Sequence, residues 1–191
     1  MGEPQFPPRP TLLAQELIRP FIHEGDIVID ATCGNGHDTL FLAECVGASG
    51  KVLAFDVQEI AIASSKAMLE ESGLADRVEF FHESHARIIG RVEAASVAVI
   101  MFNLGYLPGA NKDETTHADE TLTALAAASV SIKAGGILSV VCYPGHDAGV
   151  GESEGVERWF KAQTGAGWRV AKYGMLGTQR LAPFVLLGLR K

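Results

Sequence analysis

The sequence predicts an α/β fold with a doubly wound, seven-stranded and mostly parallel sheet whose last strand is antiparallel. Three observations lead to this prediction. Short apolar runs alternate with helical patterns along most of the 191 residues. A glycine turn at residues 34–36 joins the first apolar run to a helix. The last two runs, residues 169–175 and 183–189, have no helical pattern between them and are expected to form a closing hairpin.

The first part of the chain is expected to form an irregular arm and a helix before the sheet begins. Three prolines mark the arm: Pro7, Pro8 and Pro10. Thr11 can cap a helix over residues 11–21. Its expected apolar face consists of Leu12, Leu13, Leu17 and Ile18. We expect a single domain over residues 1–191, with the arm and helix in residues 1–24.

The remaining elements follow from apolar periodicity and from glycine positions. Residues 96–102 form a continuous apolar run suited to a central parallel strand. Gly73 closes a helix, and the pair Gly135 and Gly136 forms a turn before a strand. The expected strands are residues 26–30, 51–56, 77–82, 96–102, 137–142, 169–175 and 183–189. The expected helices are residues 37–46, 59–72, 114–131 and 152–163.

Composition restricts the class of protein. The hydrophobic content of 47% and the charged content of 20% are ordinary for a globular protein. No apolar run reaches the length that spans a membrane, so we expect no membrane partner. The three cysteines, Cys33, Cys45 and Cys142, form no CxxC pair, which indicates a reduced, cytoplasmic setting.

Residues 30–39, DATCGNGHDT, are typical of a cofactor site. Glycines at a strand-to-helix turn let backbone amides approach a ligand near the positive end of the helix dipole. A dinucleotide fingerprint has a third glycine where this chain has Thr39. Asp30, ahead of the turn, suits an ammonium group, and Asp56, at the end of the next strand, can accept hydrogen bonds from both ribose hydroxyls. An amino acid and a ribose without a phosphate describe S-adenosylmethionine, and the pattern resembles the Rossmann-like class I methyltransferases.

A second group of candidate residues follows the central strand. Asn103 lies just beyond its carboxyl end, where ligands of open α/β sheets bind. Asn103 and Tyr106 are similar to the first and last residues of the NPPY element of methyltransferases that act on exocyclic amino groups, with Leu104 and Gly105 in place of the two prolines. In that element the asparagine accepts a hydrogen bond from the attacking amine, and the aromatic ring stacks on the base. We therefore expect Asn103 and Tyr106 to be catalytic, with His146 as a candidate proton acceptor.

Four stretches together resemble a family of small bacterial RNA methylases. They are DATCGNGHDT, FNLGYLPGANK, YPGHDAG at residues 143–149 and RLAP at residues 180–183. The resemblance implies a class I methyltransferase fold and methylation of 5-aminomethyl-2-thiouridine at the tRNA wobble position. In this fold the segment after the third strand contacts the adenine, which adds Ser84 and His85. The expected cofactor-binding residues are Asp30, Gly34, Asn35, Gly36, Asp38, Thr39, Asp56, Gln58, Ser84, His85 and Asn103. Because a monomer of this size would cover little tRNA, we expect a homodimer.

Charge is distributed unevenly along the chain, whose net charge is −7. Residues 1–157 contain all 23 acidic residues and nine basic ones, whereas residues 158–191 contain seven basic residues and no acid. Phosphate binding needs a local basic surface rather than a basic protein. The turn between the last two strands should lie at the same end of the sheet as Asn103. We therefore expect RNA to contact three basic residues: Lys112, Lys172 and Arg180. A solvated helix face with chain-end charges is the alternative explanation.

Other functions are compatible with the same motifs. A methyltransferase for rRNA or for a small-molecule amine would share both of them, since no dedicated RNA-binding domain is visible. A non-catalytic module that binds S-adenosylmethionine as a scaffold would not need Asn103 or Tyr106. A metal site built from His82, His85 and either Cys142 or His146 would have no established ligand spacing, so we expect no metal.

Overall fold

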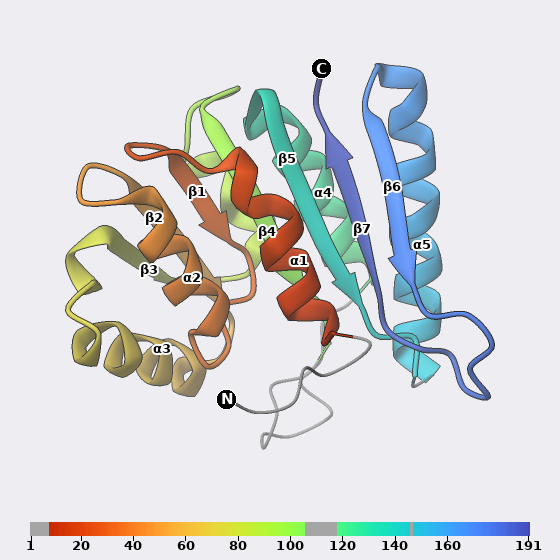
Figure 1. Cartoon of the computed structure of the whole chain (residues 1–191), viewed down its shortest axis with the longest axis horizontal. Helices are drawn as coiled ribbons and strands as arrows, with labels where there is room; N and C mark the ends of the chain where they lie inside the picture. Colours follow the sequence, from red (N-terminus) through yellow and green to blue (C-terminus); the bar gives the residue numbers. More distant parts are fainter. Residues whose placement is uncertain (1–7, 106–117, 146) are drawn as a thin grey trace.

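The structure is a computed structural model that describes residues 8–105, 118–145 and 147–191. These residues form a seven-stranded sheet in the order β3-β2-β1-β4-β5-β7-β6, with helices on both faces (Figure 1). The strands are β1 (Ile27–Asp30), β2 (Lys51–Asp56), β3 (Val78–His82), β4 (Val97–Asn103), β5 (Ile132–Cys142), β6 (Arg169–Gly174) and β7 (Phe184–Leu189). The α-helices are α1 (Pro10–Ile18), α2 (His37–Val46), α3 (Glu59–Glu71), α4 (Ala118–Ser131) and α5 (Asp147–Gln163). Short 3-10 turns are η1 (Arg19–Phe21), η2 (Ala75–Arg77), η3 (His85–Gly90) and η4 (Thr164–Ala166).

The strand directions confirm the predicted doubly wound topology. β1 pairs in parallel with β2 on one side and with β4 on the other, so the strand order reverses between these two neighbours. β3 and β5 extend the parallel sheet outward, and β7 then pairs antiparallel with both β5 and β6. In open α/β sheets, ligands bind at the carboxyl ends of the strands, next to such a reversal. The topology therefore places the site beyond Asp30 of β1 and Asn103 of β4.

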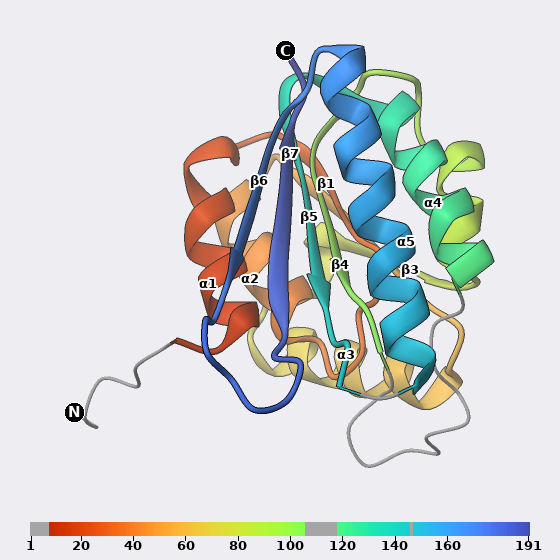
Figure 2. The same ribbon diagram turned by 90° about the vertical axis from the view of Figure 1, so that its right-hand side faces the viewer.

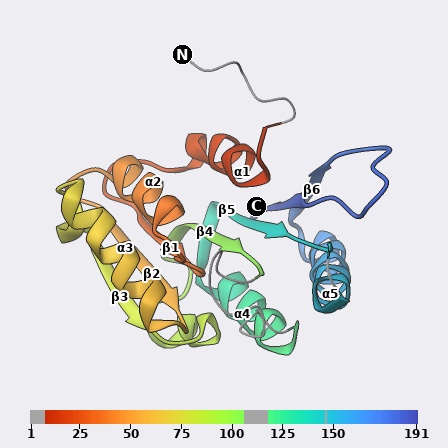
Figure 3. The same ribbon diagram turned by 90° about the horizontal axis from the view of Figure 1, so that it is seen from below.

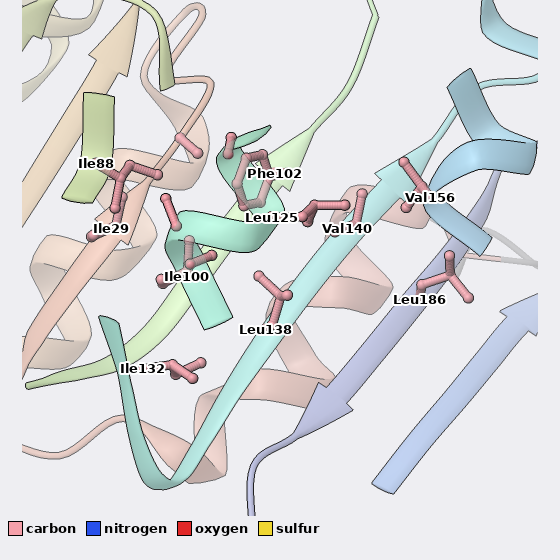
Figure 4. Close-up of a cluster of buried hydrophobic side chains, with 14 of the residues drawn as sticks. Ile29, Ile88, Ile100, Phe102, Leu125, Ile132, Leu138, Val140, Val156 and Leu186 are labelled. Atoms are coloured by element: carbon pink, nitrogen blue, oxygen red, sulfur yellow. The ribbon is translucent and has the colours of Figure 1, made fainter. Parts of the chain in front are cut away.

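Each face of the sheet buries its own apolar cluster, and successive strand residues point into opposite clusters. Val28 of β1 packs with α1, α2 and α3, whereas Ile29 packs on the other face with α4, α5 and η3. Figures 2 and 3 show these two helical layers on either side of the sheet, and Figure 4 shows the cluster around Ile29 and Phe102. Fully burying one such side chain contributes about 1.5–3 kcal/mol. The two clusters thus hold the carboxyl ends of β1, β2 and β4 in a fixed arrangement.

The first helix differs from its prediction at its start and in its buried face. It begins at Pro10, with no capping hydrogen bond from a side chain, so the predicted Thr11 cap is wrong. Proline is favoured in a first turn because its missing N–H needs no partner there. The buried residues of the helix are Ala14 and Ile18, while Leu12 is 50% exposed. The sequence pattern places Leu12 on the apolar face of the helix, but in the structure it points away from the sheet.

Two further elements begin earlier than predicted, and each contains glycines near its start. β5 begins at Ile132, and Gly135 (φ 77°) and Gly136 form a bulged part of it that hydrogen-bonds to the backbone of Arg190. α5 begins at residue 147, five residues before the prediction, although its first part contains three glycines. Burial of the apolar residues of this helix outweighs the low helix propensity of its glycines. The start of the predicted helix at residues 114–117 lies outside the described residues.

Within the described ranges, no helix combines the length and the apolar character that crossing a bilayer requires.

Candidate active site

The turn between β1 and α2 forms one wall of the site at the carboxyl edge of the sheet. Gly34 and Gly36 have positive φ angles of 49° and 90°, and Gly36 directly precedes the first turn of α2. A Cβ atom on Gly36 would lie 2.8 Å from Oγ and 2.9 Å from Cα of Ser65 on α3. A side chain at this position would therefore be strained and would also collide with α3. The turn can approach α3 this closely only because it contains glycine.

Asp56 connects the end of β2 to this turn. One of its carboxylate oxygens accepts a hydrogen bond from the backbone N–H of Gly34 at 2.9 Å, and the other accepts one from the N–H of Gln58 at 3.0 Å. Each carboxylate oxygen has two acceptor positions, so both retain capacity for a further donor. The side chain is only half-buried. The carboxylate is thus held rigidly and can still accept hydrogen bonds from a pair of hydroxyls.

Asp30 lies under the turn, with 1% of its surface exposed. Its Oδ2 accepts a hydrogen bond from Thr39 Oγ1 at 2.6 Å, and its Oδ1 accepts one from the N–H of Thr32 at 3.1 Å. Burial, followed by the nearby charge of Asp38, raises the pKa of Asp30 to about 7. The hydroxyl of Thr39 explains why a threonine occupies the position of the third glycine in a dinucleotide fingerprint.

Asp38, in the first turn of α2, connects this helix to α1. Its carboxylate is 6% exposed and accepts a hydrogen bond at 2.6 Å from Nε2 of Gln15 in α1. Burial raises the pKa of Asp38, while the hydrogen bond from the side chain of Gln15 opposes that shift. The backbone N–H of Asn103 donates to Oγ1 of Thr32 at 2.7 Å. The main chain of Asn103 is therefore held by the turn after β1.

Ser84 and His85 lie after β3, as expected. Ser84 caps η3 by accepting from the N–H of Ala86, and its hydroxyl donates to Glu120 at 3.2 Å. His85 is 7% exposed, and its Nδ1 lies 3.2 Å from the carbonyl oxygen of Ala31. Because a carbonyl only accepts, Nδ1 carries a proton. Burial lowers the pKa of His85, so its ring is neutral and Nε2 is an acceptor, with no partner among the described residues.

The structure also adds residues that the sequence did not reveal. Gln15 and Thr32 hold Asp38 and Asn103 as described above. Tyr143, just after β5, lies in van der Waals range of the position that a Cβ on Gly105 would take. Burial, and then the charge of Asp38, raise the pKa of Tyr143 to about 12. Thr32 follows Asp30 by two residues, a spacing typical of an Asx turn, but Gln15 and Tyr143 meet the site only through the tertiary fold.

Of the predicted substrate residues and the candidate proton acceptor, the structure describes only Lys172 and Arg180. Tyr106, Lys112 and His146 lie outside the described residues. Lys172 on β6 forms an ion pair with Glu157 at 2.6 Å and lies over the ring of Phe184. Arg180 is exposed in the loop between β6 and β7, which Figure 1 shows at the lower right. This loop is at the same edge as Asn103, since Gly174 pairs with Phe184, Phe184 with Cys142, and Asn103 with Val141. β5 and β7 separate the loop from β4.

Metal binding finds no support in the described ranges, which contain no group of three or more His, Cys, Asp and Glu residues that could hold an ion.

The sheet order, the glycine turn and the acids that end β1 and β2 define the class I S-adenosylmethionine-dependent methyltransferase fold. Residues 52–188 match the sequence profile of a family described as "Putative rRNA methylase", and the chain belongs to this family. Both the fold and the family agree with the sequence predictions.

Solved structures support the same conclusion. A "putative rRNA-methylase" from Clostridium thermocellum superposes with a TM-score of 0.93 at 34% identity, covering 98% of this chain and 100% of that one. A "putative methyltransferase" from Streptococcus mutans, solved in complex with SAH, superposes with a TM-score of 0.85 at 31% identity, covering 95% and 97% of the two chains.

A curated relative that matches most of this chain is named for a tRNA substrate. It is the chloroplastic tRNA (mnm(5)s(2)U34)-methyltransferase of Arabidopsis thaliana, which is 40% identical over 180 residues. The match covers 89% of this chain, and this chain spans 65% of the length of that protein.

Proposed function

We propose that this protein is an S-adenosylmethionine-dependent methyltransferase that N-methylates the aminomethyl group of 5-aminomethyl-2-thiouridine at the tRNA wobble position. The observation that carries the substrate is the 40% identity over 180 residues to the Arabidopsis tRNA methyltransferase. The site geometry supports the type of reaction, because an amide side chain lies at the end of β4, beside the glycine turn.

The residues around the turn fit S-adenosylmethionine part by part. The half-buried carboxylate of Asp56 suits the two ribose hydroxyls, and the buried Nε2 acceptor of His85 suits the amino group of adenine. Asp30 and Asp38 are the acidic side chains next to the turn that suit the ammonium group of the methionine part, whose positive charge favours their ionised forms. The proposed cofactor-binding residues are Asp30, Gly34, Asn35, Gly36, Asp38, Thr39, Asp56, Gln58, Ser84, His85 and Asn103. When bound, this cofactor supplies an electrophilic methyl group on a positively charged sulfur.

The residues of the chain then have to present the amine as a neutral nucleophile. An aliphatic amine resembles lysine, whose ordinary pKa is about 10, so it arrives protonated. A nearby positive charge and partial removal from water both lower that pKa, and the proton passes to solvent or to His146. The side-chain oxygen of Asn103 accepts one N–H of the amine and directs its lone pair, while the ring of Tyr106 stacks on the uracil. Positioning supplies most of the rate increase in this scheme.

The proposal includes a tRNA partner, a homodimer and a cytoplasmic location. Exposed Arg180, in the loop between β6 and β7, supports phosphate binding, and Lys112 and Lys172 belong to the same predicted surface. Exposed apolar side chains at the end of the same hairpin, with Leu176 97% and Leu181 61% exposed, support burial against a second copy. The three unpaired cysteines are consistent with a reducing compartment.

An rRNA substrate is the second candidate, supported by a shorter match. The ribosomal RNA small subunit methyltransferase H of Tropheryma whipplei is 32% identical over 99 residues, which cover 50% of this chain and 30% of that protein. The shorter coverage makes this candidate weaker than the tRNA substrate.

The test is a methyl-transfer assay with the purified protein, S-adenosylmethionine and tRNA from cells that lack the gene. Mass spectrometry of the digested nucleosides should show 5-aminomethyl-2-thiouridine converted into its methylaminomethyl form. Transfer to isolated 16S rRNA and none to tRNA would replace the substrate. Cofactor binding without transfer to tRNA, rRNA or small amines would favour the scaffold alternative.

A further inference from the structure

A pocket of about 310 Å³ lies between the start of α1 and the end of the β6–β7 hairpin. Pockets that bind small ligands begin at about this volume. In Figure 3, α1 and the loop of the hairpin lie on the same side of the sheet, opposite α5. None of the described lining residues is acidic, and most are apolar or aromatic. They include Pro8, Pro10 and Leu13 on the α1 side and Tyr173, Met175 and Phe184 on the hairpin side. The lining suits a flat, uncharged group.

Tyr173 provides the exposed aromatic surface of this pocket. It is 41% exposed, and none of the ring contacts among the described residues involves it. Phe184, by contrast, is 9% exposed, and the ammonium group of Lys172 lies 4.1 Å from its ring centroid. Exposed aromatic rings are the platforms on which proteins stack the bases of single-stranded nucleic acids. Tyr173 is therefore the ring that a planar ligand would contact.

Tyr173 lies in the same row across the sheet as Asn103. Asn103 pairs with Val141, Val141 with Val185, and Val185 with Tyr173. Paired residues on neighbouring strands point to the same face of a sheet. Val141 and Val185 are buried on the face that α1 covers. Three strand spacings, about 14 Å in total, separate the two ends of the row. The pocket thus lies on the same face as Asn103 and close to the expected site of methyl transfer.

Two exposed arginines flank the pocket. Arg9 directly precedes the first turn of α1, and Arg180 lies in the loop between β6 and β7. Neither has a carboxylate partner within the described ranges of the chain. Positive charge beside an aromatic platform is the combination that binds unpaired nucleotides, since the cations hold the phosphates while the base stacks on the ring. The charges around the pocket are therefore complementary to RNA.

A second copy of this chain fits the pocket less well. In a twofold dimer the same patch meets itself, so Arg9 and Arg180 would lie close to the same two arginines of the partner. Bringing like charges together at an interface costs free energy. The exposed Leu176 and Leu181, which support the proposed homodimer, do not line the pocket. The homodimer and the pocket therefore depend on different residues.

We propose that this pocket binds an unpaired nucleobase of the RNA substrate, stacked on Tyr173, while Arg9 and Arg180 hold the adjoining phosphates. We call it the base pocket. The bound base belongs to a nucleotide near the methylated one, because the pocket lies about 14 Å from Asn103. The inference rests on the proposed function, since it assumes an RNA substrate.

Equilibrium binding of tRNA from cells that lack the gene measures the contribution of the ring. Tyr173→Ala should raise the Kd about five- to a hundredfold, the range for the loss of one stacked base. Tyr173→Phe keeps the ring, so its Kd should stay within about twofold of the wild type. Leu12→Ala, at an exposed position of α1 that does not line the pocket, is the matched control and should keep the wild-type Kd. Because stacking releases no counterions, Tyr173→Ala should leave the salt dependence of binding unchanged.

A wild-type Kd in Tyr173→Ala would overturn the base pocket. If that variant keeps the Kd and its mass in solution changes, as measured by light scattering, the pocket holds a second copy. If it keeps the Kd and removal of residues 1–7 lowers the Tm of the wild type but not of Tyr173→Ala, the pocket holds the start of the chain itself. Each of these results leaves the proposed function standing, because the wild-type protein methylates the same tRNA.

Photo-crosslinking locates the base without any methyl transfer. An anticodon stem-loop RNA with 4-thiouridine next to the wobble position should crosslink to the peptide that contains Tyr173 and Met175, as identified by mass spectrometry. The yield should fall in Tyr173→Ala and persist in Leu12→Ala. Crosslinks that form only elsewhere on the protein, with 4-thiouridine at each loop position in turn, would overturn the base pocket. If the wild type neither binds nor methylates tRNA, the proposed function fails, and the same crosslinking on 16S rRNA tests the base pocket separately.

Discussion

Nε2 of Gln15 in α1 lies 2.6 Å from Oδ1 of Asp38 in the first turn of α2. α1 precedes the first strand and packs on the face of the sheet that α2 and α3 also cover. Its polar side chain nevertheless reaches the carboxyl edge, where the glycine turn and β4 meet. The helix that was expected only to lead into the sheet thus takes part in building the site.

Replacing Asp56 should weaken cofactor binding. Asp56→Ala removes the acceptor for the ribose hydroxyls and also frees the N–H of Gly34. Losing a hydrogen bond to a charged group costs about 1.5–3 kcal/mol, which is roughly a tenfold to hundredfold rise in Kd. Isothermal titration calorimetry with S-adenosylmethionine measures this. Glu59→Ala, an exposed carboxylate in the first turn of α3, is the matched control. Equal affinity in the wild type and Asp56→Ala would remove Asp56 from the site.

Replacing Asn103 should separate catalysis from cofactor binding. Asn103→Ala should lower kcat on aminomethyl-thiouridine tRNA and leave the Kd for S-adenosylmethionine within about twofold of the wild type, since its main role is to orient the amine. Tyr106→Ala should raise KM and lower kcat together if the ring stacks on the uracil. Single-turnover kinetics with calorimetry distinguish these effects. Wild-type rates in both variants would reject the comparison with the NPPY element.

The glycine turn should not tolerate a methyl group at Gly36. Gly36→Ala introduces a Cβ with positive φ and within 3 Å of Ser65, so both strain and collision destabilise the turn. We expect a loss of about 1–3 kcal/mol in unfolding free energy and weaker cofactor binding. Gly73→Ala has a similar φ of 68° but nothing within 4 Å, so it reports the cost of φ alone. Equal losses in the two variants, measured by urea unfolding, would show that the contact with Ser65 is unimportant.

Asp30 should make the folded state less stable as pH rises. Its pKa is raised from 3.8 to about 7, so between these values the folded protein holds a proton that the unfolded chain has lost. The contribution of Asp30 to stability is therefore highest near pH 4 and falls toward pH 7, by up to about 1.4 kcal/mol per pH unit. Asp30→Asn should flatten this decline, while Asp38, whose pKa is also raised, keeps part of it. Urea unfolding at pH 5 and pH 7.5 provides the measurement, and parallel curves for the two proteins would contradict the expectation.

For two elements with clear local signals, α2 and β2, the first and last residues were predicted correctly. The helix at residues 37–46 is flanked by Gly36 and Gly47, and the strand at residues 51–56 is an apolar run between a charged residue and Asp56. Both depend on periodicity and on nearby turn residues, which the sequence shows directly. The acids Asp30 and Asp56 were likewise found because they end apolar runs.

Features that depend on packing between distant segments could not be predicted. No local pattern indicates that Gln15 meets Asp38, because the contact exists only once α1 has docked on the sheet. The early start of α5 has the same cause, since buried apolar residues later in the helix outweigh its glycines.

The charge count along the sequence also missed that Glu157, just before the acid-free segment, forms ion pairs with Lys161 and Lys172. Part of the basic segment is therefore neutralised within the protein.

These pairings leave Arg180 as the most informative position for testing RNA binding. Within the described part of the chain it has no carboxylate partner, and it lies in the loop at the carboxyl edge of the sheet. If it binds a phosphate of tRNA, Arg180→Glu should weaken tRNA binding and leave the Kd for S-adenosylmethionine unchanged. The plot of log K against log salt concentration should become less steep by about 0.7–0.9, the value for one phosphate contact. Arg169→Glu makes the same change of charge at the start of β6, on the opposite edge of the sheet, and is the matched control. If both variants change the slope equally, only net charge matters, and if neither does, the RNA binds elsewhere on the protein.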